Sequence, residues 1–405
     1  MSDIGTLLKK HRSQAGLSLK VAASRVGISD GHLSAIEVGL RTPSVATLVS
    51  LTELMKIPLG EWVPTWLAQE HRPLTLCNLG AVLLDRGASE WADRVLKRAY
   101  SLDRLCSSQR YSVGIAHLRG LVCYREGRYL RACGWFRRAA IGAHHMRDPV
   151  QRGKCLYNFG LALAHTHRTS EALERLAEAI QVFRTTHRPS LLSRALLARA
   201  NTLLLQTRDY REARSLYRKA AHLCRTGPLY FDAVLGDTVA SWCLSSADIV
   251  YSKLLALQDL ATDATRAAQA HHNIGVALRQ MARPEEAISE LEAALPSQES
   301  PARLSATLTE LCLCHAILGR RDEASRCWQR AATLAGAKDA QDVAALRLLG
   351  AHLNMTSAGL DTPRGFADDY ESRVQGCIDL LTADSDPPLR SFSVVRGSAG
   401  TTSDR

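Results

Sequence analysis

Histidine and cysteine are the residues of this sequence whose side chains most readily act as nucleophiles, bases or metal ligands. Two pairs of adjacent histidines occur, at 144–145 and 271–272, but neighbours on a helix point about 100° apart. The eleven cysteines form no CxxC pair, and Cys312 and Cys314 would point about 200° apart around a helix. We therefore expect reduced, buried thiols, no metal site, no cofactor and no enzyme activity.

The chain has 405 residues and a net charge of +11, from 51 basic and 40 acidic residues. Residues 1–62 hold seven of the basic and five of the acidic residues, a net of +2 (7 − 5), so the bulk charge is weak support for an anionic partner. An apolar content of 46% with 5% aromatics suits a helical core packed through Leu and Ala. Because no apolar run of about 18 residues and no leader peptide is present, we expect a cytoplasmic protein with no membrane association.

Residues 19–38 have the spacing of two short helices joined by a tight turn. The small side chain of Ala23 stands where the two helices would cross, and Gly27 stands where the turn requires a positive φ. Ser18 and Ser29 each precede an apolar-periodic run and can accept the first free amide protons of a helix. The spacing predicts helices over about 19–26 and 30–38.

Further helices are predicted on both sides of this pair. Apolar residues recur at helical spacing from Ile4, which predicts a first helix over 3–14 that ends at Gly16. Pro43 and Ser44 begin a fourth helix, and Trp62 lies in a short fifth one. We interpret residues 1–66 as one five-helix domain.

These five helices resemble the lambda-repressor-like (XRE) family of DNA-binding domains over residues 4–62. The resemblance rests on GLS at 16–18, GIS at 27–29 and HLSAIEVGLRTPS at 32–44, in family order. It implies an all-α helix-turn-helix domain that binds double-stranded DNA, with a structural pair of Arg12 and Glu37. The residues that it places against DNA are Ser29, Asp30, Gly31, His32, Ser34, Ala35, Arg41 and Thr42.

Two departures from the family pattern affect base recognition. Leu19 replaces the usual glutamine that contacts phosphate, and several positions that are commonly basic or polar hold Asp30, Gly31 and Ala35. Asp30 suits a cytosine amino group, Ala35 a thymine methyl group, and His32 an acceptor base or a phosphate. The alternative for Asp30 is a charge that only stabilises the helix start.

Beyond residue 66, a small residue is followed 12, 16 and 19 positions later by alanine, a large residue (leucine or an aromatic) and alanine. This pattern resembles the tetratricopeptide repeat (TPR), in which small side chains let two helices approach closely. Six units begin at the lead residues Gly80, Gly120, Gly160, Asn201, Gly275 and Cys312.

Successive lead residues lie 40, 40, 41, 74 and 37 positions apart. Because 74 is twice 37, we expect a degenerate seventh unit over 228–262. We expect a TPR-type α-solenoid over 67–337, capping helices over 338–383 and a disordered polar tail over 384–405.

In TPR proteins the first helix of each unit lines a concave groove. Asn78, Asn158 and Asn273 recur two residues before a lead glycine, and an amide can donate to and accept from an extended peptide. The alternative is that each amide only caps or bridges helices. The full set of predicted groove residues is Asn78, His117, Lys154, Tyr157, Asn158, Arg199, His272, Asn273 and Arg279.

The combination of an XRE-like domain with TPR units is similar to peptide-responsive quorum-sensing regulators of the Rgg and PlcR kind. It implies a transcription regulator that binds an inverted-repeat operator as a homodimer and carries a ligand, expected to be a short peptide, in the groove. The alternative is a protein-binding scaffold on DNA, whose repeats recruit a protein partner.

Overall fold

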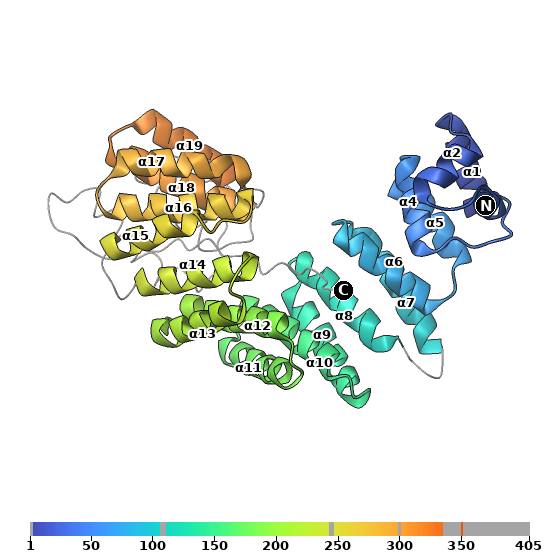
Figure 1. The fold of residues 1–405 in the computed structure, drawn as a ribbon, viewed down its shortest axis with the longest axis horizontal. Coiled ribbons are helices and arrows are strands. Elements are labelled where there is room, and N and C mark those ends of the chain that lie inside the picture. Colours follow the sequence, from blue (N-terminus) through green and yellow to red (C-terminus); the bar gives the residue numbers. More distant parts are fainter. Residues whose placement is uncertain (1–2, 106–110, 243–246, 299–300, 335–349, 351–405) are drawn as a thin grey trace. The chain divides into compact units, whose positions relative to one another are not determined.

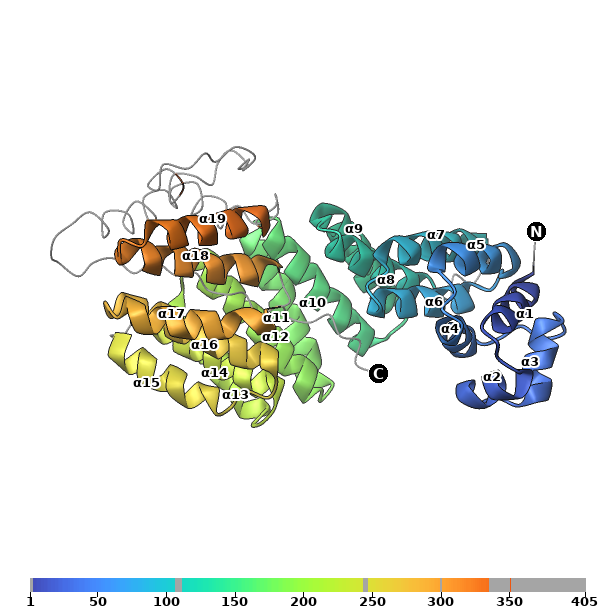
Figure 2. The ribbon, with the colours of Figure 1, turned by 90° about the horizontal axis from the view of Figure 1, so that it is seen from above.

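A computed structural model describes residues 3–105, 111–242, 247–298, 301–334 and 350. Within this part of the chain all regular structure is helical (Figures 1 and 2), in agreement with the predicted fold class. The chain divides into two compact units, the first up to Val182 and the second from Phe183 onward. Each unit is described by itself.

The first unit begins with five short helices. Polar side chains at the N-caps of the first four determine where these helices start, because each accepts a backbone N–H of its own first turn. The predicted starts after Ser18, Ser29 and Ser44 are confirmed. The bounds are α1 (Ile4–Gln14), α2 (Leu19–Val26), α3 (Asp30–Glu37), α4 (Val45–Leu54) and α5 (Leu59–Gln69).

No linker separates these five helices from the next pair. Helix α5 continues past the boundary expected at residue 66, and its Trp62 and Trp66 are 1% exposed. They share one apolar core with Leu76 and Leu79 of the following helix. The first five helices and the first repeat are therefore packed as one body.

Helix pairs follow within each unit, and each helix packs on the next one from residue 73 to residue 165 and from residue 189 to residue 334. Before the unit boundary they are α6 (Pro73–Asp85), α7 (Ser89–Leu105), α8 (Ser112–Arg125), α9 (Tyr129–His145) and α10 (Pro149–His165), and α11 (Thr169–Thr185) spans the boundary after Val182. The second unit contains α12 (Pro189–Thr202), α13 (Tyr210–Leu223), α14 (Pro228–Trp242), α15 (Ala247–Gln258), α16 (Ala264–Gln280), α17 (Pro284–Ala294), α18 (Pro301–Ile317) and α19 (Arg321–Leu334).

The lead glycines permit the close approach within a pair. A Cβ added at Gly160 would lie 2.7 Å from the side chain of Leu176, and one at Gly275 would lie 2.6 Å from Leu291. These partners are the large residues sixteen positions later in the repeat pattern. A larger side chain at either of these two positions would push the helices apart, which explains the glycine there.

Asn201 leads the one unit whose second helix carries a tyrosine at the large position. The hydroxyl of Tyr217 donates a 2.5 Å hydrogen bond to Oδ1 of Asn201, so a polar contact replaces the glycine contact. Helix α12 then continues as a π-helix over Leu203–Thr207. The sequence pattern did not predict this local widening.

Helices α14 and α15 occupy the interval expected for the degenerate unit. Gly236 lies against Tyr217 of α13, because a Cβ added there would lie 2.3 Å from the tyrosine ring. Nε1 of Trp242 donates a 2.8 Å hydrogen bond to Gln280 in α16. Helices α14 and α15 therefore pack against the helix pairs on both sides through these contacts, and not through the alanines of the repeat pattern.

The predicted capping helices (338–383) and tail (384–405) lie outside the described residues, apart from Gly350. Every cysteine in the described ranges is a free thiol, and Cys312 and Cys314 are both buried. No described helix has the length and apolar character that crossing a membrane requires.

Candidate DNA-binding surface and ligand groove

The turn between α2 and α3 has the geometry that the sequence predicts. Gly27 adopts φ 74°, and the hydroxyls of Ser18 and Ser29 each accept a backbone N–H at 3.2 Å. Ala23 and Leu33 are fully buried between the two helices. The turn and the two caps therefore fix the start of α3, where the predicted base-reading residues lie.

Arg12 and Glu37 form a two-pronged ion pair between α1 and α3. Nε and Nη2 of Arg12 donate to the two carboxylate oxygens at 2.6 and 2.9 Å, and Nη1 donates to the carbonyl of Leu17 at 2.8 Å. The hydrogen bond to Glu37 raises the pKa of Arg12 above its usual value, although burial opposes it. This pair positions α3 from behind and leaves its opposite face open.

Gly5 is a second structural residue of this domain, and sequence reasoning missed it. A Cβ added at Gly5 would lie 2.3 Å from the carbonyl oxygen of Ile36, so α1 and α3 touch backbone to backbone. A helix-interior glycine in the apolar repeat of the first helix was the available signal.

The predicted DNA-facing residues form two groups by exposure. Ser29, Asp30 and Gly31 at the start of α3 are exposed, as are Arg41 and Thr42 in the loop after it. His32, Ser34 and Ala35 are half-buried along the outer side of α3. Space above Gly31 is open, since a Cβ there would meet nothing within 4 Å. Within the described part of the chain, the start of α3 is therefore exposed and its outer face is partly exposed.

Two further contacts fix the helices behind the turn. Nε2 of His11 lies 2.9 Å from Oε1 of Glu61, and this hydrogen bond lowers the pKa of Glu61. Arg86, which follows α6, forms a 2.8 Å ion pair with Glu53 of α4. The second contact joins the five-helix domain to the first repeat.

The groove residues predicted in the first unit are partly brought together. Nδ1 of His117 in α8 lies 3.2 Å from Sγ of Cys155 in α10, and its Nε2 lies 3.4 Å from Nδ2 of Asn158. Burial, and secondarily the charge of Lys154, lowers the pKa of His117 to about 4. Burial raises the pKa of Cys155 to about 12. Both groups are therefore neutral near pH 7, which does not suit a cysteine nucleophile.

The other predicted groove residues of the first unit differ in exposure. Asn78 on α6 is exposed, while Lys154 and Tyr157 on α10 are half-buried. Asn158 is 9% exposed. Helices α8 and α10, the first helices of their pairs, thus share a polar strip formed by His117, Lys154, Tyr157 and Asn158. Asn78 lies on α6, the first helix of the preceding pair.

The groove residues predicted in the second unit are occupied by contacts within it. Nδ1 of the fully buried His272 lies 3.0 Å from the hydroxyl of Thr307, and the amide of Asn273 donates to the carbonyl of Gln269 at 2.7 Å. Nε of Arg279 donates to Glu310 at 2.7 Å, in a pair whose side chains are 7% and 4% exposed.

Arg199 is the remaining predicted residue, and it forms a 2.8 Å ion pair with Glu212. The amides of Asn78, Asn158 and Asn273 therefore have three different environments: exposed, bonded to a neighbouring repeat, and bonded to the same helix. Among the described residues, no group of three or more His, Cys, Asp or Glu side chains is placed to hold a metal ion.

Two stretches of the chain match known sequence families. Residues 8–62 match the helix-turn-helix family and residues 268–298 match the tetratricopeptide repeat family, and both families are binding modules and not enzymes. No curated protein sequence matches this chain.

Three solved structures share the fold over most of the chain at low sequence identity. The apo form of RapI aligns with a TM-score of 0.54 and 12% identity, covering 65% of this chain and 97% of RapI. A tetratricopeptide repeat protein from Parabacteroides merdae aligns with a TM-score of 0.54 and 14% identity, covering 70% of this chain and 98% of that protein. NprR in complex with its cognate peptide NprX aligns with a TM-score of 0.51 and 13% identity, covering 94% of this chain and 100% of NprR. Residues 8–62 are thus a helix-turn-helix domain, and the chain shares a TPR-like α-solenoid fold with these structures.

Proposed function

We propose that this protein is a transcription regulator that reads operator DNA through α3 and carries a ligand, a short peptide, on its repeats. One observation carries the proposal: a helix-turn-helix with an open outer face shares a continuous core with the first repeat pair. A change in the repeats is thereby mechanically coupled to the helices that position α3. The solenoid fold also occurs in NprR, which was crystallised with its cognate peptide.

Base recognition is assigned to α3. The double variant His32→Ala with Ala35→Glu should abolish specific DNA binding and preserve the fold, because both side chains lie outside the fully buried core and the new carboxylate repels phosphates. Ala68→Glu adds the same charge at an exposed position of α5 and is the control. Genomic footprinting of both variants tests the assignment. Wild-type occupancy by the double variant would refute it.

The operator is expected to be an inverted repeat. A single domain of this size reads few base pairs, so two copies should occupy half-sites about 34 Å, or a multiple of that distance, apart. Light scattering of the protein with and without operator DNA tests for a homodimer. Only monomers at micromolar concentration, in both samples, would contradict it.

The ligand is assigned to the polar strip of α8 and α10 in the first unit. Lys154, Tyr157 and Asn158 there combine a cation, an aromatic ring and an amide, which suits a peptide with a carboxylate and exposed amide groups. In the second unit, by contrast, the side chain of Arg279 is only 7% exposed and Asn273 only 4%, whereas Lys154 and Tyr157 of the first unit are half-buried. Extraction of the purified full-length protein, followed by mass spectrometry, identifies what the protein carries. A stable protein partner with no small ligand would favour the scaffold function instead.

A further inference from the structure

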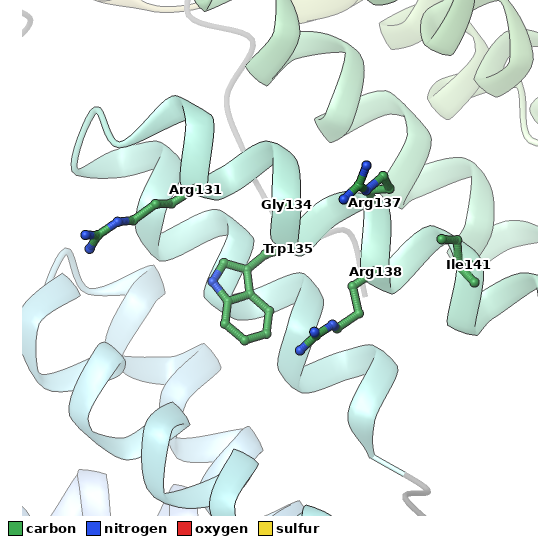
Figure 3. A pocket seen from close by; sticks show the side chains of 6 residues that line it. All are labelled: Arg131, Gly134, Trp135, Arg137, Arg138 and Ile141. Atoms are coloured by element: carbon green, nitrogen blue, oxygen red, sulfur yellow. The ribbon is translucent and has the colours of Figure 1, made fainter.

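The outer face of α9 carries a hollow of about 450 Å³ (Figure 3). All of its lining residues come from this one helix: Arg131, Gly134, Trp135, Arg137, Arg138 and Ile141. Helix α9 is the second helix of its pair, whereas the polar strip assigned to the ligand lies on the first helices α8 and α10. The hollow is therefore a separate surface of the first unit.

Gly134 opens this hollow. It is exposed in the middle of α9, and a Cβ added there would meet nothing within 4 Å. A glycine inside a helix is destabilising relative to alanine, and here no described neighbouring helix requires it. The structure therefore offers no packing reason for this glycine.

The arginines around the hollow have no acidic partner among the residues that the structure describes. Arg131, Arg137 and Arg138 are exposed, and none of them forms an ion pair within the described part of the chain. In contrast, Arg128 just before α9 pairs with Glu126, and Arg152 on α10 lies 3.7 Å from Glu178. The face of α9 is thus a cationic surface that no acidic side chain of the described residues neutralises.

An aromatic cluster holds part of this charge in place. The guanidinium carbon of Arg119 from α8 lies 4.1 Å from the centre of the Trp135 ring, and that of Arg138 lies 5.3 Å from it. Nη1 of Arg138 also donates to the hydroxyl of Tyr100 at 2.5 Å. Cations fixed in this way lose less conformational entropy when a partner binds.

The surroundings favour a protein partner over a nucleic acid. Leu130 and Ile141 on the same helix are 72% and 54% exposed, and phosphate backbones would leave such side chains in water. Trp135 is also poorly placed to stack a base, because guanidinium groups already lie over its ring. A partner with both carboxylates and apolar side chains matches all of these features.

We propose that this face of α9 is a docking surface for an acidic, amphipathic helix of a partner protein. Carboxylates of that helix would pair with Arg131 and Arg138, and an apolar side chain would enter the hollow over Gly134. This inference goes beyond the proposed function, because it uses a different surface and a different kind of partner.

The test uses the full-length protein and a fluorescent peptide of about 14 residues, or four helical turns, with Glu and Leu at amphipathic spacing. Fluorescence anisotropy should show saturable binding by the wild type. The double variant Arg131→Gln with Arg138→Gln should weaken binding at least about tenfold. Gly134→Leu should weaken it by a similar factor without lowering the melting temperature, because its side chain fills only the hollow.

The matched control is Arg211→Gln with Lys219→Gln, which removes two exposed positive charges from α13. It should bind the peptide like the wild type. The proposal is overturned if the wild type does not bind the peptide, if the α9 variants bind it normally, or if the control weakens equally. It is also overturned if an oligothymidylate binds more tightly through the same arginines, which would identify a nucleic-acid surface.

Discussion

His117 in the first unit and His272 in the second occupy the same repeat position, three residues before a lead glycine. In each case Nδ1 lies close to a side chain five positions before the next lead residue. Nδ1 of His117 lies 3.2 Å from Sγ of Cys155, and Nδ1 of His272 lies 3.0 Å from the hydroxyl of Thr307. His117 remains half-buried, whereas His272 is fully buried. The same repeat position is therefore partly exposed in one unit and closed off between helices in the other.

The asparagines beside these histidines differ in the same way. The Nδ2 atom of Asn158 lies near His117 of the neighbouring repeat, whereas the amide of Asn273 donates to its own helix at Gln269. The second unit also closes its first helices with the pair of Arg279 and Glu310. We infer that first-helix polar residues stabilise the stacking of repeats in the second unit, whereas Lys154 and Tyr157 of the first unit are half-buried and belong to the strip to which we assign the ligand.

The largest expected effect concerns the buried ion pair of the second unit. Arg279→Met should lower the free energy of unfolding by about 3 kcal/mol or more, because the Glu310 carboxylate stays buried without this guanidinium. Adding Glu310→Leu should restore most of the loss. For comparison, Asn78→Ala changes an exposed first-helix residue of the first unit, and it should alter the free energy of unfolding by less than about 0.5 kcal/mol. Urea unfolding measures all three. Equal losses at Arg279 and Asn78 would break the comparison.

The next effect is a pH dependence due to His117. Its pKa is lowered to about 4 in the folded protein, against about 6.5 when unfolded. Between these values the unfolded state binds more protons, so stability is fully present above pH 6.5 and falls as the pH drops towards 4. The loss should be on the order of 3 kcal/mol at pH 4, since each unit of pKa difference corresponds to about 1.4 kcal/mol.

His117→Gln should remove this part of the pH dependence. Thermal melts of wild type and variant at pH 7.5 and pH 4.5 provide the measurement, with the difference between the two proteins as the readout. A variant whose melting temperature falls as much as that of the wild type would show that His117 does not titrate as described.

A smaller effect separates the two asparagines. Asn158→Ala should weaken retention of the bound ligand about tenfold, which corresponds to one or two hydrogen bonds. Asn273→Ala should leave retention unchanged, because its amide bonds to Gln269. Mass spectrometry of material extracted from equal amounts of each variant measures this. Equal retention by the two variants, both well folded, would end the assignment of the ligand to the first unit.

The smallest effect sharpens the role of Lys154. Its positive charge is the secondary cause of the lowered pKa of His117, so Lys154→Gln should raise that pKa by less than about one unit. The melting temperature at pH 7.5 should stay near the wild-type value. The Lys154 side chain is only half-buried, and His117 is uncharged at this pH, so the charge of Lys154 has little effect on it. An NMR titration of the His117 ring measures the pKa. A lower pKa in the variant would contradict this electrostatic cause.

The sequence by itself determined the features that depend on residues close together in the chain. Ser18, Gly27 and Ser29 define α2 and α3 because caps and turns are made by groups within a few residues of one another. The lead glycines define the pairs because the pattern recurs at nearly constant spacing. The motif around Arg12 and Glu37 also predicted a pair that joins two helices.

Only the tertiary structure decided how much of each repeat position remains accessible. The burial of His272 and the half-burial of His117 depend on helices about forty residues away, and repeat spacing carries no information about those contacts. The shared core across Trp66 and Leu76 also arose from side chains that the pattern assigned to two domains. Local propensities fix the helices, but the cost of burying each polar group is set by the neighbour that packing brings against it.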